Sequence, residues 1–378
     1  MRVLISSTDG ISKLFPLVPL AWAFRAAGHE VLVTFAEQLD QARTTGLQVV
    51  DVAPGFDGMA ILGKAIEDEP ELAAIWADPL GDDPGALSVA NALLNRPFLD
   101  RTLDLAERWR PDLVVYEQTA TYGLITAAHL GVPAVQRNLG LIRTGELHQA
   151  TCSRMPDVHA RIRTAELPSP ARIFEYVPPS MLPFPTPEGD FLRELPFTGG
   201  TALEDPSPAP PDRARIAITM GSTKPGTDGL GPMAATIEAA SQVDAEFILA
   251  LGAAADGPLP ALPANVRVIG WTPLDVLLRG CTAIIHHGGS MTAMAAIDAG
   301  IPQLLALPPQ SMGNKTVGPG VRHRGVGMIA LEDEVDVGTV ERLLSDEQMR
   351  LATGEVRTEM HGLPTPAEVV PGLVELAS

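Results

Sequence analysis

Short β-rich runs alternate with helical stretches through most of this chain, and that alternation restricts its fold more than any other feature. In the first half, the apolar runs RVLIS (Arg2 to Ser6), EVLVT (Glu30 to Thr34) and LVVY (Leu113 to Tyr116) are separated by stretches with helical patterning. Strands that alternate with helices predict a parallel sheet with helices on both faces. A segment rich in Asp, Pro and Gly interrupts the alternation from Pro54 to about Gly85, and we expect it to form loops that bind a substrate.

A proline-rich segment divides the chain in two. Residues 201–213, TALEDPSPAPPDR, favour an extended linker because proline and polar residues exclude regular structure. The alternation then restarts with RIAIT at Arg215. A length of 378 residues suits two domains of ordinary size. We therefore predict two Rossmann-like, doubly wound α/β domains, residues 1–200 and 214–360, whose strands end at a shared crevice.

The charge of the chain excludes several kinds of partner. Lysine and arginine number 27 against 46 acidic residues, which gives a net charge of −19. Such a chain repels phosphate backbones and anionic lipid surfaces, so neither nucleic acid nor membrane is an expected partner. The first apolar run is too short for a signal peptide or a membrane span, and we expect a cytoplasmic protein. Cys152 and Cys281 lie far apart in the sequence, which indicates neither a disulfide framework nor a cysteine zinc site.

Two common nucleotide-binding motifs are missing where the sheet pattern would place them. The segment from Ser6 to Lys13, after the first strand, lacks the G-x-G-x-x-G spacing that brings a backbone close to a pyrophosphate. The segment from Met220 to Lys224, MGSTK, lacks the upstream glycine of a P-loop. These absences argue against a nicotinamide enzyme and against a P-loop ATPase.

The segment from Ala283 to Gly300, AIIHHGGSMTAMAAIDAG, predicts a strand, a glycine turn and a helix. The first backbone amides of a helix are unpaired and carry the positive end of its dipole, so this turn suits a diphosphate, with Ser290 and Thr292 adding hydrogen bonds. The alternative is an ordinary glycine turn with Ser290 as N-cap. His286 and His287 are adjacent on a strand and point to opposite faces, so we expect no metal site there.

The same turn resembles the nucleophile elbow of serine hydrolases. Residues 288–292, GGSMT, nearly match G-x-S-x-G, and Asp333 and His361 follow in the expected order. Thr292 stands where the tight elbow requires a small residue, which disfavours a hydrolase.

Several longer motifs resemble one known family. They are FPLVPLAWAFRAAGHEVLV (Phe15 to Val33), PDLVVYE (Pro111 to Glu117), GWTPLDVLL (Gly270 to Leu278), HHGGSMT and AGIPQLLALP. With them the chain resembles, over nearly its whole length, family 1 glycosyltransferases of the GT-B fold. Its motifs are most similar to those of actinobacterial enzymes that attach deoxysugars to antibiotic aglycones such as polyketides and enediynes. The resemblance implies that residues 361–378 form a helix that crosses back to the N-terminal domain.

The resemblance also implies that the C-terminal domain binds the donor, usually a dTDP-deoxysugar, without a metal ion or other cofactor. Gly313 and Asn314 would contact the sugar, although the sequence SMGN at 311–314 replaces the Asp-Gln pair of many relatives and suits a sugar with fewer hydroxyl groups. Trp271 has an alternative interpretation as a packed core residue. The residues expected around the base and the diphosphate are Ser222, Thr223, Trp271, Thr272, His287, Gly289, Ser290, Met291 and Thr292.

The position of the usual catalytic base departs from the family pattern. Many relatives carry His, and some Asp, at the position of Lys13, supported by an acid at the position of Glu117. A lysine of ordinary pKa is protonated at pH 7, and an ion pair between Lys13 and Glu117 is expected to hold it so. Three interpretations follow: Asp9 or Glu117 is the base, the acceptor is a phenol or aromatic carbon that needs less activation, or activity has been lost. The second is the most consistent with the sequence.

The acceptor pocket is expected to include Met59, Ile61 and His148, whose alternative role is loop or local packing. Altogether the sequence predicts an inverting glycosyltransferase that moves a deoxysugar from a dTDP-sugar to a hydrophobic aglycone. A catalytically silent protein that binds nucleotide sugars and helps another enzyme is the alternative. The expected partners are these two small molecules, and the chain allows a homodimer.

Overall fold

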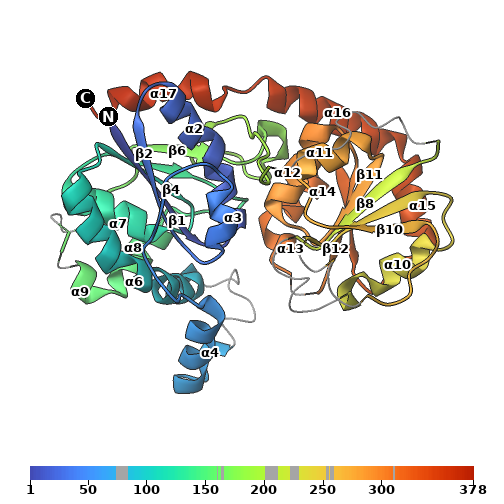
Figure 1. Ribbon diagram of the computed structural model, residues 1–378, viewed down its shortest axis with the longest axis horizontal. Coiled ribbons are helices and arrows are strands. Elements are labelled where there is room, and N and C mark those ends of the chain that lie inside the picture. The colour runs from blue at the N-terminus through green and yellow to red at the C-terminus, as the bar shows by residue number, and fades with distance from the viewer. Residues whose placement is uncertain are drawn as a thin grey trace. The chain divides into compact units, whose positions relative to one another are not determined.

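The structure is a computed structural model that describes residues 1–73, 84–159, 161–162, 166–200, 212–221, 230–252, 255, 259–309 and 311–378. These residues form two compact units (Figure 1). The N-terminal unit contains residues 1–176, 186–192 and 364–378, and the C-terminal unit contains residues 177–185 and 193–363.

The N-terminal unit is built on a parallel sheet with the strand order β3-β2-β1-β4-β5-β6-β7. Its central strands are buried on both faces, which explains their continuous apolar runs. The strands are β1 (Arg2–Asp9), β2 (Glu30–Ala36), β3 (Val49–Asp51), β4 (Leu113–Glu117), β5 (Ala134–Arg137), β6 (Arg172–Glu175) and β7 (Asp190–Phe191). The helices are α1 (Ile11–Leu14), η1 (Phe15–Leu17), α2 (Val18–Ala26), α3 (Leu39–Arg43), α4 (Gly58–Asp68), α6 (Pro84–Trp109), α7 (Thr121–Leu130), α8 (Leu147–Ser153), α9 (Pro156–His159) and α17 (Pro366–Glu375).

The C-terminal unit repeats this design on a second parallel sheet, with the order β10-β9-β8-β11-β12-β13. Its strands are β8 (Arg215–Thr219), β9 (Glu246–Ala250), β10 (Val266–Ile269), β11 (Ala283–His286), β12 (Gln303–Leu307) and β13 (Gly327–Leu331). Its helices are η2 (Pro179–Met181), η4 (Gly231–Met233), α10 (Ala234–Ala240), α11 (Leu274–Leu277), η6 (Leu278–Gly280), α12 (Ser290–Ala299), α13 (Gly313–Thr316), α14 (Gly318–Arg324), α15 (Val337–Ser345) and α16 (Glu347–His361).

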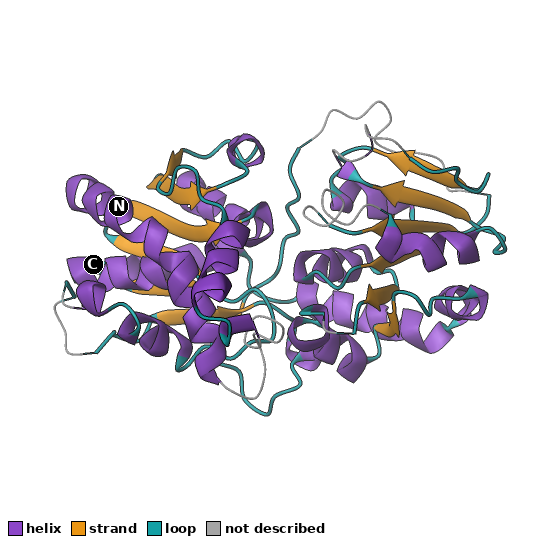
Figure 2. Ribbon diagram, turned by 90° about the horizontal axis from the view of Figure 1, so that it is seen from below, coloured by secondary structure: helices purple, strands orange, loops and turns teal. Residues whose placement is uncertain are grey.

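Helices cover both faces of each sheet (Figure 2). Apolar side chains of strands and helices pack together in each unit, around Phe98 and Tyr122 in the first and around Ile218 and Phe247 in the second. The prediction of two doubly wound α/β domains is therefore confirmed.

Each sheet has one point where the strand order reverses direction, and ligands of open α/β sheets bind at such points. In the N-terminal unit this point lies between β1 and β4, and in the C-terminal unit between β8 and β11. All strands in each sheet are parallel, so their carboxyl ends meet at one edge. The segments that leave these four strands are therefore the first places to look for a site.

The boundary between the units differs from the predicted one at residue 200. Residues 177–185 and 193–200 belong to the C-terminal unit. The reason is hydrogen bonding to residues far along the chain: Ser180 N donates to Glu359 Oε1 on α16 (2.8 Å), and Leu274 N donates to Thr198 Oγ1 (2.8 Å). Residues 201–211 of the predicted linker lie outside the described residues.

The C-terminal segment belongs to the N-terminal unit from residue 364 onward. Helix α17 begins with a capping box, in which the side chain of Thr365 accepts from Glu368 N and the side chain of Glu368 accepts from Thr365 N. Its apolar residues Val370 and Leu373 are buried where the helix packs against α2.

The segment from Pro54 to Gly85 is not only loop, contrary to the sequence prediction. It contains α4, eleven residues long, which begins where Asp57 Oδ1 accepts a hydrogen bond from Ala60 N (2.9 Å). An Asp N-cap before a helix is a recognisable signal that the general polarity of the segment concealed.

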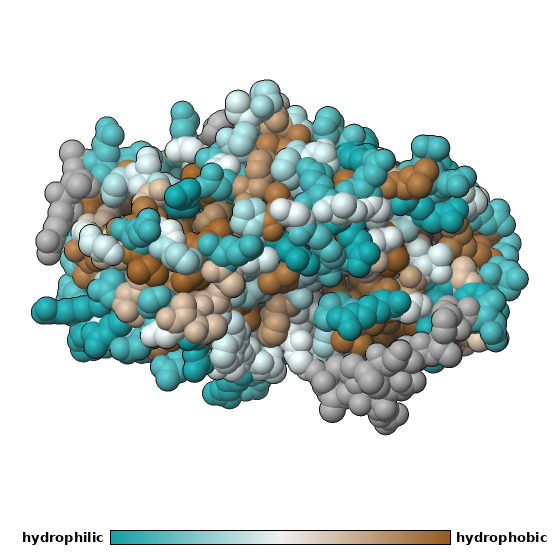
Figure 3. Space-filling view, turned by 90° about the horizontal axis from the view of Figure 1, so that it is seen from above, coloured by the Kyte–Doolittle hydropathy of each residue, from teal (hydrophilic) through white to brown (hydrophobic). Residues whose placement is uncertain are grey.

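The surface face seen in Figure 3 mixes hydrophobic and hydrophilic side chains. Among the described residues, no helix combines the length and the apolar character that a membrane span requires.

Candidate functional site

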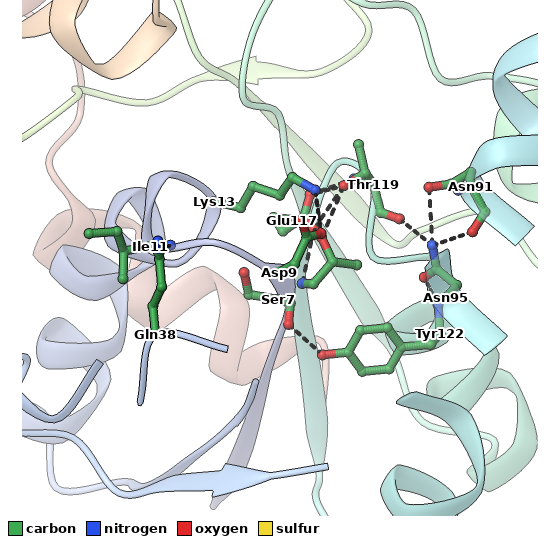
Figure 4. Close-up of polar contacts among 11 residues, drawn as sticks. Ser7, Asp9, Ile11, Lys13, Gln38, Asn91, Asn95, Glu117, Thr119 and Tyr122 are labelled. Carbon is green, nitrogen blue, oxygen red and sulfur yellow. Dashed lines mark hydrogen bonds and ion pairs between the residues drawn. The ribbon is translucent and has the colours of Figure 1, made fainter. Parts of the chain in front are cut away.

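The predicted catalytic residues of the N-terminal unit lie together at the reversal point between β1 and β4 (Figure 4). Asp9 ends β1, and Gly10, at a φ of 81°, turns the chain into the short helix that carries Lys13. A positive φ of this kind strongly favours glycine. Glu117 ends β4, the neighbouring strand.

Glu117 is fully buried and saturated with hydrogen bonds. It accepts bonds from Thr8 N (3.2 Å) and Thr8 Oγ1 (2.6 Å) at the end of β1. It also accepts from Thr119 N (2.5 Å) and Thr119 Oγ1 (2.9 Å) just beyond its own strand. The buried carboxylate therefore joins the ends of β1 and β4.

Lys13 pairs with Asp9 and not with Glu117, which corrects the predicted ion pair. Its Nζ lies 2.8 Å from Asp9 Oδ1 and donates to Thr8 Oγ1 at 3.1 Å. Thr8, whose hydroxyl bonds Glu117, thus stands between the lysine and the buried acid. Backbone spacing explains the pairing, since Asp9 and Lys13 are four residues apart across one tight turn.

The ion pair keeps both Lys13 and Asp9 in their charged forms. Burial opposes the charge of Lys13, but Asp9 and Glu117 outweigh it and raise the lysine pKa above its usual value. Burial likewise disfavours the charged form of Asp9, and the charge and hydrogen bond of Lys13 overcome this and lower the pKa of the carboxyl. Lys13 is therefore an ammonium group at neutral pH and does not accept a proton.

His148, predicted to line an acceptor pocket, lies in the interior with 6% of its surface exposed. Its Nδ1 lies 2.8 Å from Thr121 Oγ1 and its Nε2 lies 2.8 Å from Gln136 Oε1. Gln136 Nε2 donates to Asn138 and Thr144, so Gln136 Oε1 must accept from Nε2–H of the imidazole. Both ring nitrogens thus form hydrogen bonds within the unit, and through Gln136 the histidine is connected to Thr144 in the loop after β5.

Burial of His148 makes the stability of the N-terminal unit depend on pH. Burial lowers the pKa of His148 to about 4 from an ordinary 6.5. Between these values the unfolded chain binds a proton that the folded chain does not, so stability falls as pH falls from 6.5 toward 4. We expect His148 to contribute a loss of roughly 1.4 kcal/mol per pH unit in this window.

Urea unfolding at pH 7.0 and 5.5 measures this contribution. His148→Gln should lose less stability than the wild type over the same interval. The matched control is His323→Gln, an exposed position on α14, which should keep the wild-type pH dependence. Equal pH dependence of all three proteins would contradict the assignment of a neutral buried imidazole.

The other two predicted acceptor residues lie on α4. Met59 is 68% exposed, and Ile61 is half-buried. The next residue, Leu62, faces inward instead and is buried against α6. An exposed, flexible methionine side chain can contact an apolar ligand. The acceptor role of Met59 stays a prediction.

The predicted diphosphate turn lies at the reversal point of the second sheet. His287 follows β11, and Gly288, with a φ of 81°, leads to Gly289 as the N-cap of α12. The first backbone bond of the helix runs from Ala293 N to Gly289 O (3.0 Å). The amides of Ser290, Met291 and Thr292 precede it and have no acceptor within the helix.

Glycines make room for the His287 ring on two sides. A Cβ at Gly221, which follows the neighbouring strand β8, would lie 2.5 Å from His287 Cε1. A Cβ at Gly289 would lie 2.7 Å from His287 Nε2. The imidazole is therefore enclosed between two backbone segments, beside the open end of α12. Gly221 lies in the segment MGSTK, whose partial likeness to a P-loop does not indicate this role, and a glycine directly after a strand is the available signal.

His286 has a structural role. It is completely buried, and burial lowers its pKa to about 3, so the ring is neutral. Its Nε2 donates to Gln303 Oε1 (3.0 Å) and its Nδ1 accepts from Gly288 N (3.2 Å). Within the residues that the structure describes, no group of three or more His, Cys, Asp or Glu side chains is arranged to hold a metal ion.

Gly313 packs directly against the predicted diphosphate turn. A Cβ at this position would lie 3.0 Å from Gly288 O. Asn314 follows at the start of α13, half-buried, with its N–H donating to Ser311 O (3.0 Å). The segment predicted to contact the sugar is therefore adjacent to the segment predicted to bind the diphosphate.

Trp271 is 42% exposed and is not a core residue, so its alternative interpretation is wrong. It follows β10, and its ring lies over Gly252 beyond β9, where a Cβ would approach Trp271 Cε3 to 3.3 Å. Thr272, beside it, is half-buried. Both residues lie at the edge of the sheet that carries the His287 turn, whereas Ser222 and Thr223 lie outside the described residues.

The residues of the hydrolase hypothesis are not assembled. His361 Nε2 bonds Asp298 Oδ1 (2.8 Å) at the carboxyl end of α12. Asp298 is eight residues beyond Ser290 along one helix, a separation of about 12 Å. His361, the histidine of that hypothesis, is therefore not placed to accept a proton from Ser290.

Comparison with known proteins supports the same family as the sequence motifs. The two domain profiles described as erythromycin biosynthesis protein CIII-like match residues 22–221 (N-terminal domain) and 234–376 (C-terminal domain). Among curated relatives, the elloramycin glycosyltransferase of Streptomyces olivaceus is 36% identical over 98% of this chain and 96% of its own.

Solved structures agree with this. The glycosyltransferase SnogD from Streptomyces nogalater matches with a TM-score of 0.84 and 33% identity, over 100% of this chain and 99% of its own. The spinosyn rhamnosyltransferase SpnG, solved with thymidine diphosphate, matches with a TM-score of 0.81 and 26% identity, over 99% of this chain and 100% of its own. The chain belongs to the erythromycin biosynthesis protein CIII-like family of nucleotide-sugar-dependent glycosyltransferases, which have the GT-B fold.

Proposed function

We propose that this protein is an inverting glycosyltransferase that moves a deoxysugar from a dTDP-sugar to a phenolic natural-product aglycone, at a phenol oxygen or an aromatic carbon. The observation that carries the proposal is the open amino-terminal end of α12 at the reversal point between β8 and β11. Family membership makes sugar transfer the reaction, and this end of the helix is where a diphosphate would bind.

The donor would be held by backbone groups of the C-terminal unit. The amides of Ser290, Met291 and Thr292 would bind the diphosphate, and His287 would add a ring N–H. Four donors and a helix dipole can take the place of a divalent cation as the leaving diphosphate gains charge. We therefore propose that no metal ion is required. A thymine base is proposed because SpnG was solved with thymidine diphosphate.

The acceptor class follows from the residue at position 13. Lys13 is held as an ammonium group by Asp9 and does not deprotonate a hydroxyl group. Phenols have a pKa of about 10, whereas an aliphatic alcohol is far less acidic, close to water. A site without a histidine base is therefore better matched to a phenol or an electron-rich aromatic carbon.

Transfer would proceed by direct attack of the acceptor atom on the anomeric carbon, opposite the departing diphosphate. One bond forms to the acceptor as the bond to the diphosphate oxygen breaks, and the electron pair leaves with dTDP. A single displacement of this kind inverts the anomeric centre. Positioning and stabilisation of the leaving group supply most of the rate enhancement.

Calorimetric titration with dTDP and with UDP tests the donor assignment. We expect dTDP to bind more tightly than UDP, and His287→Ala to weaken dTDP binding by about tenfold because one hydrogen bond to a charged group is lost. Both affinities should be unchanged by EDTA. His323→Ala, an exposed position on α14, is the control. Unchanged affinity in His287→Ala would remove this residue from the donor site.

The alternative is a catalytically silent helper protein that binds a nucleotide sugar. It remains an alternative because Lys13 cannot act as a base. It predicts binding of dTDP without turnover. Incubation with dTDP-L-rhamnose and a panel of hydroxylated anthraquinones, followed by mass spectrometry, separates the two. A glycosylated product that requires the donor would exclude the helper hypothesis.

A further inference from the structure

We infer that Asp9 is the catalytic base of this enzyme and that Lys13 is the positioning residue that keeps it ionised and oriented toward the acceptor. The inference rests on the proposed function and assigns the residue that replaces the missing histidine. It depends on the accessibility of Asp9, on the contacts that hold its carboxylate, and on the charged groups around it.

Accessibility separates the two acids of the cluster. Glu117 is 0% exposed, and its carboxylate already accepts from two backbone amides and two hydroxyl groups. A carboxylate has about four lone-pair sites, so Glu117 has none left for a substrate. The side chain of Asp9 is 28% exposed and gives Lys13 one oxygen, Oδ1. An acceptor hydroxyl can therefore reach Asp9 and cannot reach Glu117.

Lys13 fixes the direction and the charge of Asp9. Its side chain crosses one helical turn to Oδ1 at 2.8 Å and is itself held by Thr8 Oγ1 at 3.1 Å. The turn is anchored from the other side, because Gln38 Oε1 accepts from Ile11 N (2.9 Å). Gln38 has a left-handed backbone, with φ 42°, an uncommon conformation for this residue type. Such strain is characteristic of functional sites.

Lys13 is needed to keep Asp9 ionised, because two other acidic residues lie near the pair. Glu117 faces Lys13 from β4, and Glu37 faces Lys13 from the end of β2. Burial, Asp9 and Asp57, the N-cap of α4, raise the pKa of Glu37. Without the ammonium group, these acids and burial would favour the protonated form of Asp9. With it, the pKa of Asp9 is below the ordinary value.

The chemical step is a single proton transfer coupled to the displacement. The acceptor O–H bond breaks as its proton moves to an oxygen of Asp9, and the acceptor oxygen forms its bond to the anomeric carbon. The bond to the diphosphate breaks, and dTDP leaves with the electron pair. Asp9 then releases the proton to water. A weak base of this kind suits a phenol, whose proton is far easier to remove than that of an aliphatic alcohol.

Asp9→Asn tests the base. We expect kcat for a hydroxylated anthraquinone with dTDP-L-rhamnose to fall at least 100-fold, the ordinary contribution of a general base. The dissociation constant for dTDP should stay within twofold, since the donor residues belong to the other unit. Asp40→Asn is the matched control, because Asp40 forms an exposed ion pair with Arg43 in the same unit. Its kcat should match the wild type.

Lys13→Gln tests the positioning role through the pH profile. The wild type should keep a constant kcat/KM from pH 7 down to pH 5. In Lys13→Gln the pKa of Asp9 rises, and an acid limb should appear at a higher pH than in the wild type. Lys13→Arg should restore the wild-type profile. A lysine with only a structural role would lower activity equally at every pH.

The outcomes distinguish the inference from the proposed function. If the wild type binds dTDP and glycosylates a phenol while Asp9→Asn retains kcat within threefold, Asp9 is not the base and the proposed function stands. A Lys13→Gln profile identical to that of the wild type would refute the positioning role alone. If the wild type neither binds dTDP nor forms product, the proposed function fails and the inference fails with it.

Discussion

Replacing Gly288 with alanine is expected to weaken dTDP binding by about 100-fold. Gly288 has a φ of 81°, and an alanine Cβ there would lie 2.5 Å from Leu307 Cδ2 and 3.2 Å from Gly313 Cα. The left-handed conformation costs an L-residue about 1–2 kcal/mol, and the clash with Gly313 involves backbone that cannot rotate away. The turn must therefore shift, and the amides at the start of α12 shift with it.

The size of the effect follows from the bonds at stake. Hydrogen bonds to charged groups contribute about 1.5–3 kcal/mol each, and loss of one or two accounts for about 2.7 kcal/mol, or 100-fold. Calorimetric titration with dTDP measures it, and circular dichroism shows whether the variant is folded.

Gly354→Ala is the control for this variant. Gly354 lies inside α16, where a Cβ meets nothing within 4 Å. We expect normal dTDP binding and a small gain in stability, since alanine is the better helix former. A folded Gly288→Ala protein with wild-type affinity would show that the turn after β11 is not the diphosphate site.

Replacing Glu117 with alanine is expected to destabilise the N-terminal unit by about 4 kcal/mol. The substitution leaves the buried amides of Thr8 and Thr119 without their acceptor. Each unsatisfied buried group costs about 1–3 kcal/mol, and the two threonine hydroxyls lose their partner as well. Because these bonds join the ends of β1 and β4, the loss also disturbs Asp9 and Lys13.

Urea unfolding of Glu117→Ala and of the wild type measures this effect. Two units can unfold in separate transitions, so the transition of the N-terminal unit must be followed by a probe within it. Glu107→Ala is the control, because Glu107 is half-exposed and pairs with His129 at the surface. It should lose less than about 1 kcal/mol. A Glu117→Ala protein as stable as this control would refute the structural role of the buried acid.

Much of the fold was predictable because it depends on local pattern. The apolar run RIAIT is the strand Arg215–Thr219, and the segment from Ala283 to Gly300 contains the predicted strand, Ala283–His286, and the predicted helix, which begins at Ser290. Strands that are buried on both faces need continuous apolar runs. The first backbone amides of a helix have no acceptor within it, so the residues at its start must leave these amides accessible to another partner. These requirements act within a few residues and are therefore visible in the sequence.

The assignment of two segments that precede the predicted linker to the C-terminal unit was not predictable in this way. Residues 177–185 and 193–200 follow no sequence signal that assigns them to the C-terminal unit. Their assignment depends on contacts with partners far along the chain, such as Ser180 with Glu359. Contacts of this separation are invisible to periodicity and capping patterns.

The candidate sites divide in the same manner. By itself the sequence indicated the family and the glycine turn before α12. Tertiary structure decided that Lys13 pairs with Asp9, that Glu117 is saturated and inaccessible, that His148 is buried, and that Trp271 is exposed. Residue types and spacing fix which groups a turn can offer. Which group keeps solvent access and spare hydrogen-bonding capacity depends on the strands and helices that pack around it.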